Sequence, residues 1–335
     1  MSKNNHGKNI CIIGDGGWGT ALALVLHGNG HNVTVWGPFP DYISRIRRTG
    51  ENESYLPGVK LPATLKWTAD CKDAAAAADV AILAVPTKFY RSVVTSFNGL
   101  LPDSCGLLSV AKGFDPESQK RMTEVAREIL GHLLVAALSG PSHAEEVAAN
   151  IPTAVTVASK DKGFRHDLQI MFSNSRFRVY TSDDIAGIEL GGALKNVIAV
   201  AVGVSDGLGF GDNTRAALIT RGLAEISRLG CALGARASTF AGLSGMGDLI
   251  VTCTSRHSRN RSVGERLGKG EKLDAILSGM KQVAEGIWNC STARDLAHNK
   301  GIEVPITEEV YSIVHKGKSP LAAVESLMSR DVKPE

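Results

Sequence analysis

The 335-residue sequence lacks the marks of several protein classes. It holds six cysteines, none with the CxxC spacing of a metal or redox site, and in a chain of this length this predicts reduced thiols in a cytoplasmic protein. No uncharged apolar run is long enough to cross a membrane, and the polar first residues predict no secretory signal. Lysine and arginine total 37 against 34 acidic residues, so neither a nucleic acid nor stable membrane insertion is expected.

Apolar spacing divides the chain into two parts. Short apolar runs alternate with helix-like segments in the first part, a pattern typical of a mostly parallel sheet with crossover helices. After about Asp183 the spacing becomes helical throughout, which predicts an all-α second domain. We therefore expect domains at residues 1–183 and 184–335. The expected strands cover residues 9–14, 32–36, 79–86, 106–113, 133–141, 153–159 and 178–182.

The segment GDGGWG contains Gly14, Gly16 and Gly19 in the spacing GxGxxG. It follows an expected strand and opens an expected helix. In that context the first glycine permits a tight turn, the second lets a pyrophosphate approach the backbone, and the third allows the helix to pack closely on the sheet. The motif predicts a dinucleotide site in a Rossmann-like α/β domain.

The acid that usually follows this motif is missing. About 20 residues on, where a carboxylate would meet the ribose 2′-hydroxyl of NAD, the chain has Trp36, Gly37 and Pro38. None of these has a carboxylate that could bind the ribose of NAD, or a basic side chain that could bind the 2′-phosphate of NADP. The cofactor is therefore NAD or NADP with no assigned preference, and discrimination below about 100-fold is expected.

Lys195 lies in the middle of a mostly apolar helical segment, with Gly191 and Gly192 on its face one turn earlier. An unpaired buried ammonium is costly, so this group must be paired, deprotonated or turned toward a wet cleft. Two glycines in a helix indicate a close neighbour. Tight helix packing around a snorkelling lysine and a functional lysine in a cleft are both open on this pattern.

Two further groups carry binding chemistry. Ser258 could cap a helix that presents Arg259 and Asn260 in its first turn, an arrangement suited to a phosphate, although a solvated basic face has the same pattern. Lys112 follows an expected strand at the end where open sheets bind ligands. Asp248 lies in a glycine-rich turn.

The nine histidines show no metal spacing, so we expect them to be structural or exposed, and we expect no metal site.

Over nearly its whole length the sequence resembles a bacterial-type NAD(P)-dependent glycerol-3-phosphate dehydrogenase. The most specific stretches are GALKNVIAVAVGVSDGLGFGDNTRAALITRGL, GDLIVTCTSRHSRNRSVG and GKSPLAAVESLMSR, beside GDGGWGTALA, YLPGVKLP, LAVPT, AKGF, LSGPSHAEEVA and VAEG. The resemblance implies reduction of dihydroxyacetone phosphate to sn-glycerol 3-phosphate, which supplies glycerophospholipid synthesis. It also implies a cytoplasmic homodimer whose C-terminal domain is similar to that of 6-phosphogluconate dehydrogenase.

The resemblance also implies the site residues. Lys195 is then the catalytic proton donor and acceptor. The implied substrate contacts are Lys112, Gly140, Ser142, Lys195, Asp248, Ser258, Arg259 and Asn260. The implied cofactor contacts are Gly17, Trp18, Lys112, Ala144, Arg259, Val283 and Glu285, beside the motif glycines Gly14, Gly16 and Gly19.

The sequence departs from the family pattern at three positions. The family commonly has serine where Gly17 stands, phenylalanine where His143 stands, and an arginine near Pro38. Two other functions remain open. A β-hydroxyacid dehydrogenase shares the Gly-x-x-x-Lys spacing of Gly191 to Lys195, but usually has asparagine where this chain has Ala199. A non-catalytic dinucleotide-sensing protein would share the fold without needing the lysines.

Overall fold

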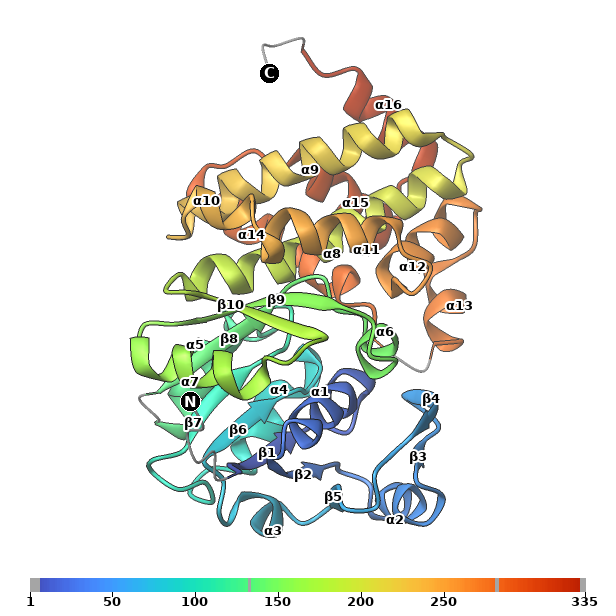
Figure 1. Cartoon of the computed structure of the whole chain (residues 1–335). Helices are drawn as coiled ribbons and strands as arrows, with labels where there is room; N and C mark the ends of the chain where they lie inside the picture. Colours follow the sequence, from blue (N-terminus) through green and yellow to red (C-terminus); the bar gives the residue numbers. More distant parts are fainter. Residues whose placement is uncertain (1–6, 132–133, 281–282, 332–335) are drawn as a thin grey trace.

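The structure is a computed structural model that describes residues 7–131, 134–280 and 283–331. Its first half is built on an eight-stranded sheet with strand order β10-β9-β8-β7-β6-β1-β2-β5, and helices make up the rest (Figure 1). The strands of this sheet are β1 (Asn9–Ile13), β2 (Asn32–Trp36), β5 (Lys66–Thr68), β6 (Val80–Leu83), β7 (Gly106–Ser109), β8 (Val135–Ser139), β9 (Thr153–Ser159) and β10 (Phe177–Ser182).

The expected mostly parallel sheet is confirmed. Every neighbouring pair of strands is parallel except β8 and β9, which are antiparallel. The seven predicted strands are all present, although Leu133 at the start of one prediction lies outside the described residues. The short strand β5 and a separate hairpin of β3 (Glu51–Asn52) and β4 (Leu56–Lys60) were not predicted, because their sequences are short and polar.

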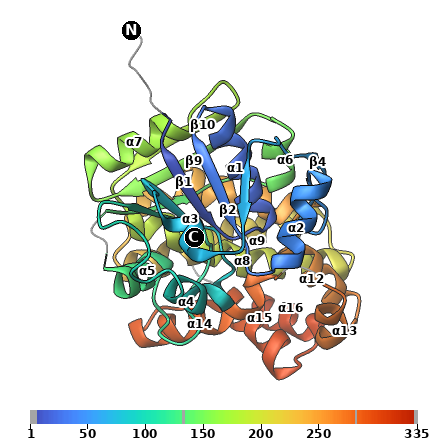
Figure 2. The ribbon, with the colours of Figure 1, turned by 90° about the horizontal axis from the view of Figure 1, so that it is seen from below.

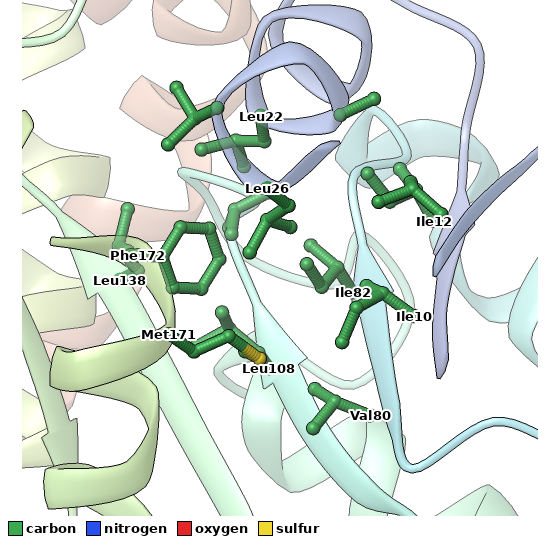
Figure 3. Packing of buried hydrophobic residues seen from close by; sticks show 14 of the residues in the cluster. Ile10, Ile12, Leu22, Leu26, Val80, Ile82, Leu108, Leu138, Met171 and Phe172 are labelled. Carbon is green, nitrogen blue, oxygen red and sulfur yellow. The ribbon is translucent and has the colours of Figure 1, made fainter. Parts of the chain in front are cut away.

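Helices cover both faces of the sheet. One face carries α1 (Gly17–Gly28), α2 (Pro40–Thr49), α6 (Ala144–Ala148) and α7 (Lys162–Phe172), and the other carries α3 (Cys71–Ala75), α4 (Thr87–Thr95) and α5 (Met122–Leu130). Alternate residues of β1 serve the two cores: Ile10 and Ile12 belong to the first and Cys11 and Ile13 to the second. Figure 3 shows the first core, where Leu22 of α1 packs close to these isoleucines.

The second half is built around α8 (Ile185–Gly207). The described residues after Ser182 form no strand, so the all-α prediction is confirmed for them. The other helical elements are α9 (Asp212–Ala232), α10 (Ala237–Phe240), the π-helix η1 (Leu243–Gly247), α11 (Asp248–Thr254), α12 (Arg259–Gly268), α13 (Leu273–Ser278), α14 (Glu285–Lys300), α15 (Pro305–Lys316) and α16 (Pro320–Met328). They stack on the edge of the sheet where the parallel strands end, and Figure 2 shows α8 and α9 behind the sheet domain, with α12 to α16 extending past it.

Helix α8 is the central element of the second half. By length and composition it could cross a membrane, but 89% of the relevant window is buried inside the protein, as in the core helix of a soluble protein. Its apolar side chains enter two cores, with Leu194 and Ile198 in one and Val197 and Val200 in the other. Burial on both sides explains why the sequence of α8 is apolar nearly all round.

Glycines let α12 approach α8 at backbone distance. A Cβ placed on Gly203 of α8 would lie 2.1 Å from the carbonyl oxygen of Arg261, and one on Gly264 of α12 would lie 2.1 Å from that of Val200. Neither atom is the end of a flexible side chain, so neither contact can be relieved cheaply. This packing fixes the start of α12 relative to the middle of α8.

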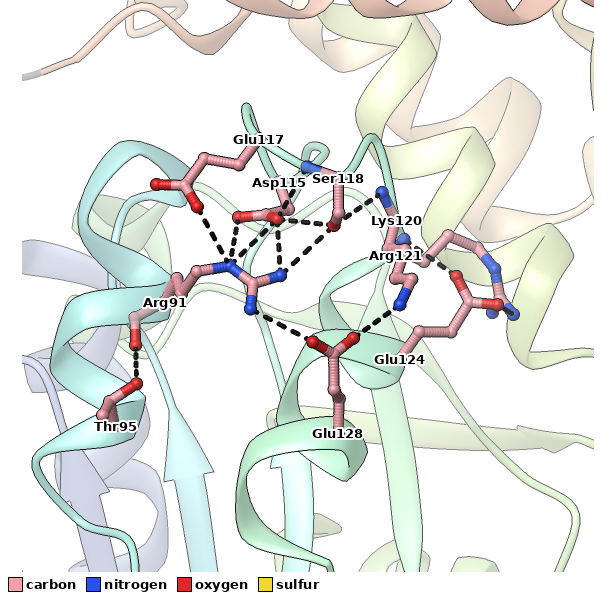
Figure 4. Close-up of polar contacts among 9 residues, drawn as sticks. All are labelled: Arg91, Thr95, Asp115, Glu117, Ser118, Lys120, Arg121, Glu124 and Glu128. Carbon is pink, nitrogen blue, oxygen red and sulfur yellow. Dashed lines mark hydrogen bonds and ion pairs between the residues drawn. The ribbon is translucent and has the colours of Figure 1, made fainter.

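A network of charged side chains holds the loop between β7 and α5, which contains Lys112 (Figure 4). Arg91 of α4 donates to the buried carboxylate of Asp115 at 2.7 Å and pairs with Glu128 of α5 at 3.3 Å. Lys120 pairs with the same Glu128 at 2.6 Å. The loop is therefore tied to both helices that flank it.

The same loop is tied to α8 through a buried carboxylate. Glu189 accepts hydrogen bonds from the backbone N–H of Thr123 at 2.8 Å and from the guanidinium of Arg121 at 2.7 Å. Glu189 lies six residues before Lys195 on the same helix. These contacts connect the two halves of the molecule close to the candidate site.

The glycine contacts between α8 and α12 predict that alanine changes stability differently at two helical glycines. Gly203→Ala should lower the free energy of unfolding by about 1–3 kcal/mol, because its Cβ would overlap the backbone of α12. Gly28→Ala is the matched control. Gly28 ends α1 with no atom within 4 Å of the added Cβ, so alanine there should be neutral or stabilise by up to about 1 kcal/mol. Denaturant unfolding of both proteins measures the difference, and equal stabilities would contradict this account.

Candidate functional site

One carboxylate binds two lysines at the junction of the two halves. Lys195 of α8 and Asp248 at the start of α11 are buried, with 5% and 1% of their surfaces exposed. The Lys195 ammonium donates to one carboxylate oxygen of Asp248 and to the hydroxyl of Thr252, the latter at 2.7 Å. Lys112 donates to the other carboxylate oxygen at 2.7 Å. Asp248 therefore bridges two ammonium groups that come from different halves of the molecule.

Burial and charge act in opposite directions on this cluster. Burial lowers the pKa of Lys195 to about 7, with Asp248 opposing the shift and the positive charge of Lys112 adding to it. The sequence could not decide between these effects, and in the structure burial outweighs the carboxylate. For Asp248, burial favours the neutral acid, but the two lysines outweigh it and lower the pKa. Asp248 is thus ionised at pH 7 while Lys195 exchanges its proton close to neutral pH.

Glycines on α8 make room for protein rather than for substrate. A Cβ on Gly191 would lie 2.4 Å from the carbonyl oxygen of Ser244 in η1, and one on Gly192 would lie 2.7 Å from the hydroxyl of Ser139. Both positions therefore face packed atoms. The tight-packing interpretation holds for these two glycines, while Lys195 itself is paired. The close approach of α8 brings Asp248, directly after η1, within reach of Lys195.

The ends of β7 and β8 supply the other side of the site. The Lys112 ammonium also donates to the carbonyl oxygen of Gly140 at 3.0 Å, and the hydroxyl of Ser142 donates to the same oxygen at 2.9 Å. Gly140 has a φ of +143°, a conformation that favours glycine, and it turns the chain sharply after β8. The structure thus brings Lys112, Gly140 and Ser142 together with Asp248, while their contact with a substrate stays a prediction.

Asn196, next to Lys195, connects three elements. Its amide nitrogen donates to the Lys112 carbonyl oxygen at 3.3 Å, and its amide oxygen accepts from Asn260 of α12 at 3.0 Å. Asn260 in turn accepts from the backbone N–H of Gly286 on α14 at 2.9 Å. The side chain of Asn260 is therefore committed to the protein, and the predicted substrate contact would have to use the backbone or a rearranged side chain.

The first turn of α12 has the predicted cap. The hydroxyl of Ser258 accepts from the backbone N–H of Arg261 at 3.2 Å, which commits that hydroxyl to the helix. The side chain of Arg259 is exposed at its surface, and the protein around it lowers its pKa by desolvation, while the carboxylates of Glu285 and Glu145 oppose that shift. Arg259 is thus the cationic side chain of this turn that remains available to a ligand.

Glu285 connects the start of α14 to the start of α4. Its carboxylate accepts from the backbone N–H of Thr87 at 3.0 Å and from the Thr87 hydroxyl. Burial raises the pKa of Glu285, against the opposing effects of Thr87 and Arg259. Val283, two residues earlier, is half-buried. Both predicted cofactor residues therefore lie where the helical half meets the carboxyl edge of the sheet.

The glycine loop has the geometry that a pyrophosphate requires. Gly14 has a φ of +124°, and its N–H donates to the carbonyl oxygen of Trp36 at 3.0 Å. A Cβ on Gly19 would lie 2.3 Å from the Gly14 carbonyl oxygen, whereas one on Gly16 would meet nothing within 4 Å. No side chain among the described residues caps α1, so its first N–H groups are open to an anion.

Two neighbours complete this loop. A Cβ on Gly17 would lie 2.6 Å from the carbonyl oxygen of Tyr55 and 3.7 Å from the Cβ of Ala144, so glycine fits here where the family commonly has serine. The indole N–H of Trp18 is buried and has no hydrogen-bond partner within the described part of the chain. The predicted residues Gly17 and Ala144 thus lie side by side.

Sequence reasoning missed several residues of this region. Thr252, Asn196 and Ser139 contact the lysine cluster, but an isolated hydroxyl or amide carries no signal of its own in a sequence. His143 was expected to be structural or exposed. Its Nε2 is buried without a partner among the described residues, and burial, then Lys195 and Lys112, lower its pKa. The only available signal was its place in the turn that follows β8.

A separate cavity lies elsewhere in the sheet domain. It has a volume of about 670 Å³ and is lined by Asn9 and Asn32, which begin β1 and β2, and by Arg47 and Arg48 of α2. Open parallel sheets bind ligands at the carboxyl ends of their strands, and this cavity is at the amino ends. No predicted site residue lines it. Across the described residues, no group of histidine, cysteine, aspartate and glutamate side chains could hold a metal ion.

Comparison with known proteins places this geometry in a family. The family model described as NAD-dependent glycerol-3-phosphate dehydrogenase N-terminus matches residues 9–165, and the corresponding C-terminus model matches residues 184–325. A glycerol-3-phosphate dehydrogenase (NAD(P)+) of Geobacillus kaustophilus is 51% identical over 331 residues, which cover 98% of this chain and 96% of that protein. One of Moorella thermoacetica is 49% identical over 323 residues, 96% of each chain.

Solved structures agree with the sequence relatives. The crystal structure of glycerol-3-phosphate dehydrogenase from Coxiella burnetii has a TM-score of 0.93 and 40% identity, covering 97% of this chain and 99% of that one. A ketopantoate reductase from Ralstonia eutropha has a TM-score of 0.61 at 16% identity, a likeness of fold alone. With both family models matched and half of its residues shared with such relatives, the chain belongs to the NAD-dependent glycerol-3-phosphate dehydrogenase family.

Proposed function

We propose that the chain catalyses the reversible reduction of dihydroxyacetone phosphate to sn-glycerol 3-phosphate with NADH or NADPH. The observation that carries the proposal is the buried Lys195 ammonium, held by Asp248 beside Lys112, in a chain of this family. Reduction of a ketone places negative charge on its oxygen, and an ammonium within hydrogen-bond reach stabilises that charge and supplies the proton.

The nicotinamide dinucleotide, when bound, supplies the hydride for reduction and accepts it in the reverse direction. The open N-terminus of α1 and the loop from Gly14 to Gly19 are suited to hold its pyrophosphate. The remaining proposed cofactor contacts lie at the carboxyl edge of the sheet and on the helices that meet it: Trp18, Lys112, Ala144, Arg259, Val283 and Glu285.

Lys195 is proposed to move the proton. As an ammonium it donates to the substrate carbonyl oxygen, and as a neutral amine it accepts the hydroxyl proton in the oxidation direction. A pKa near 7 populates both forms at neutral pH, which suits a reversible reaction. Asp248 orients the amine together with Thr252, and Lys112 adds positive charge for the substrate oxygens.

Arg259 is proposed to bind the substrate phosphate. It is exposed in the first turn of α12, where the free backbone N–H groups of the helix and the guanidinium can act on the same anion. Ser258 supports this turn through its cap, and Asn260 holds the turn against α8 through Asn196.

The two other functions are not favoured. Ala199, where β-hydroxyacid dehydrogenases usually have asparagine, is fully buried in the apolar core of the helical half. A dinucleotide-sensing protein would not need a carboxylate between two buried ammonium groups. Turnover of dihydroxyacetone phosphate separates all three functions, because neither alternative would reduce it.

We also propose the finer assignments that accompany this activity. The domains are residues 1–183 and 184–335, a division supported by the end of β10 at Ser182 and the start of α8 at Ile185. The enzyme is proposed to be a cytoplasmic homodimer that supplies glycerophospholipid synthesis. Its six cysteines are free, which fits a reducing compartment. Sedimentation analysis tests the dimer.

Lys195→Met tests the proton donor. It keeps most of the apolar stem and removes the charge, so the protein should fold and bind cofactor while reduction falls by about 100-fold or more. Lys269→Met, which removes an exposed lysine of α12's C-terminal cap, is the control and should keep full activity. A folded Lys195→Met protein with kcat close to that of the parent would show that the lysine is structural.

Opposite pH shifts test the charge cluster. Reduction needs the ammonium form, so its rate should fall as pH rises through about 7. Asp248→Asn removes the group that raises the pKa of Lys195, so the pH at which the reduction rate falls should decrease by about one unit or more. Lys112→Met removes a group that lowers this pKa, so the reduction rate should fall at a higher pH than in the parent. Profiles of kcat against pH that shift in the same direction would contradict the assignment.

Arg259→Ala tests phosphate binding. It should lower kcat/KM for dihydroxyacetone phosphate by about 10-fold or more, the scale of a lost charge-assisted hydrogen bond, while unphosphorylated dihydroxyacetone loses little. Arg256→Ala, three residues earlier and also exposed, is the matched control. An equal loss of kcat/KM for both substrates would show that Arg259 does not bind the phosphate.

A further inference from the structure

One oxygen of a buried carboxylate lies unpartnered inside the glycine loop. Asp15, between Gly14 and Gly16, is 7% exposed, and its Oδ2 is buried with no hydrogen-bond partner in the described ranges. Its main-chain carbonyl oxygen accepts from the side-chain amide of Asn52 at 2.7 Å, so the backbone of the loop is held independently of the carboxylate. The side chain is therefore not needed to keep the loop in place.

The carboxylate lies at the carboxyl end of β2. The loop is tied to that strand because the Gly14 N–H donates to the carbonyl oxygen of Trp36, the last residue of β2. A Cβ placed on Gly37, the next residue, would lie 2.5 Å from Oδ2 and 2.6 Å from Cγ of Asp15. Gly37 thus leaves the space that the Asp15 side chain occupies.

This is the place where dinucleotide-binding folds usually carry an acid. That acid ordinarily belongs to the end of β2 and accepts a hydrogen bond from the ribose 2′-hydroxyl. In this chain Trp36, Gly37 and Pro38 offer no carboxylate, but the neighbouring loop delivers one to the same position. Burial, and after it the charge of Asp15, raises the pKa of Tyr55, whose carbonyl oxygen would lie 2.6 Å from a Cβ on Gly17, so the carboxylate lies near a residue that packs on the glycine loop.

The nearby arginines do not compensate this negative charge. On α2, Arg45 lies over the ring of Tyr42 at 5.0 Å and 4.0 Å from Glu53, while Arg47 donates to the Trp67 carbonyl oxygen at 2.8 Å. Arg48 lines the cavity at the amino ends of the strands. A 2′-phosphate would bring a charge of about −1.5 to −2 against a buried carboxylate with no bound cation.

We propose that Asp15 determines cofactor specificity: its carboxylate accepts a hydrogen bond from the ribose 2′-hydroxyl of NADH and repels the 2′-phosphate of NADPH. This inference rests on the proposed function, because it concerns the dinucleotide of that reaction. It replaces the weak discrimination expected from the end of β2 alone with a strong preference for NADH. Burial raises the pKa of Asp15 to about 6, so the carboxylate is charged in assays at about pH 8.

The experiment measures binding as well as turnover. Dissociation constants for NADH and NADPH, and for ADP-ribose and its 2′-phosphate, are measured by calorimetry on the parent and on Asp15→Asn, which keeps the shape and removes the charge. The parent should bind NADH about 100-fold more tightly than NADPH. In Asp15→Asn the affinity for NADPH should rise about 10-fold or more, and that for NADH should fall by a smaller factor.

Two further variants make the result specific. Asp41→Asn removes an exposed acid from the first turn of α2, close in sequence to the end of β2, and should leave the NADH/NADPH ratio unchanged within about twofold. Gly37→Ala places a Cβ where the Asp15 carboxylate lies and should shift the ratio in the same direction as Asp15→Asn.

Each outcome decides the question. Equal affinities for both cofactors in the parent, or a parallel loss of both in Asp15→Asn, would overturn the role of Asp15 and leave the reaction standing if dihydroxyacetone phosphate is still turned over. A preference that collapses in Asp15→Asn supports the inference. If that preference is found in a protein that does not reduce dihydroxyacetone phosphate, the role of Asp15 holds and the proposed function fails.

Discussion

The candidate site depends on one buried carboxylate. Asp248 accepts hydrogen bonds from Lys195 of α8 and Lys112 of the β7–α5 loop, and so joins the two halves of the molecule through a shared charge. With both lysines protonated, two ammonium groups and one carboxylate leave one positive charge at this junction. Burial, with the charge of Lys112 adding to it, lowers the pKa of Lys195 against the opposing effect of Asp248.

Backbone packing fixes the distances within this cluster. Because Gly191 has no side chain, η1 can pack against the backbone of α8, and Gly203 and Gly264 allow α12 to approach the same helix. Cores packed at this density tolerate little added volume, so the positions of Asp248 and of the α12 cap follow from the glycines. The few side chains proposed to carry out the chemistry are thus positioned by backbone packing as well as by their own hydrogen bonds.

The sequence predicted what depends on local pattern. The strands, the glycine loop, the Ser258 cap and the helical second half follow from periodicity and from residue types at fixed offsets, and the structure has them. It could not predict contacts between segments far apart in the chain. Asp15 and Gly37 are 22 residues apart and meet only because β1 and β2 are parallel neighbours. The role of Gly191 depends on a π-helix more than 50 residues away, which has no sequence signal that we recognise.

Two further carboxylates bind the halves of the molecule to each other, and one of them lies on the same helix as Lys195. Glu189 of α8 is held by Thr123 and Arg121, and Glu285 of α14 is held by Thr87 at the start of α4. Separating the halves would break these charge-assisted hydrogen bonds, each worth about 1.5–3 kcal/mol. A wide hinge-bending motion is therefore disfavoured in this protein. The two halves are therefore held in one arrangement by contacts at more than one place along their junction.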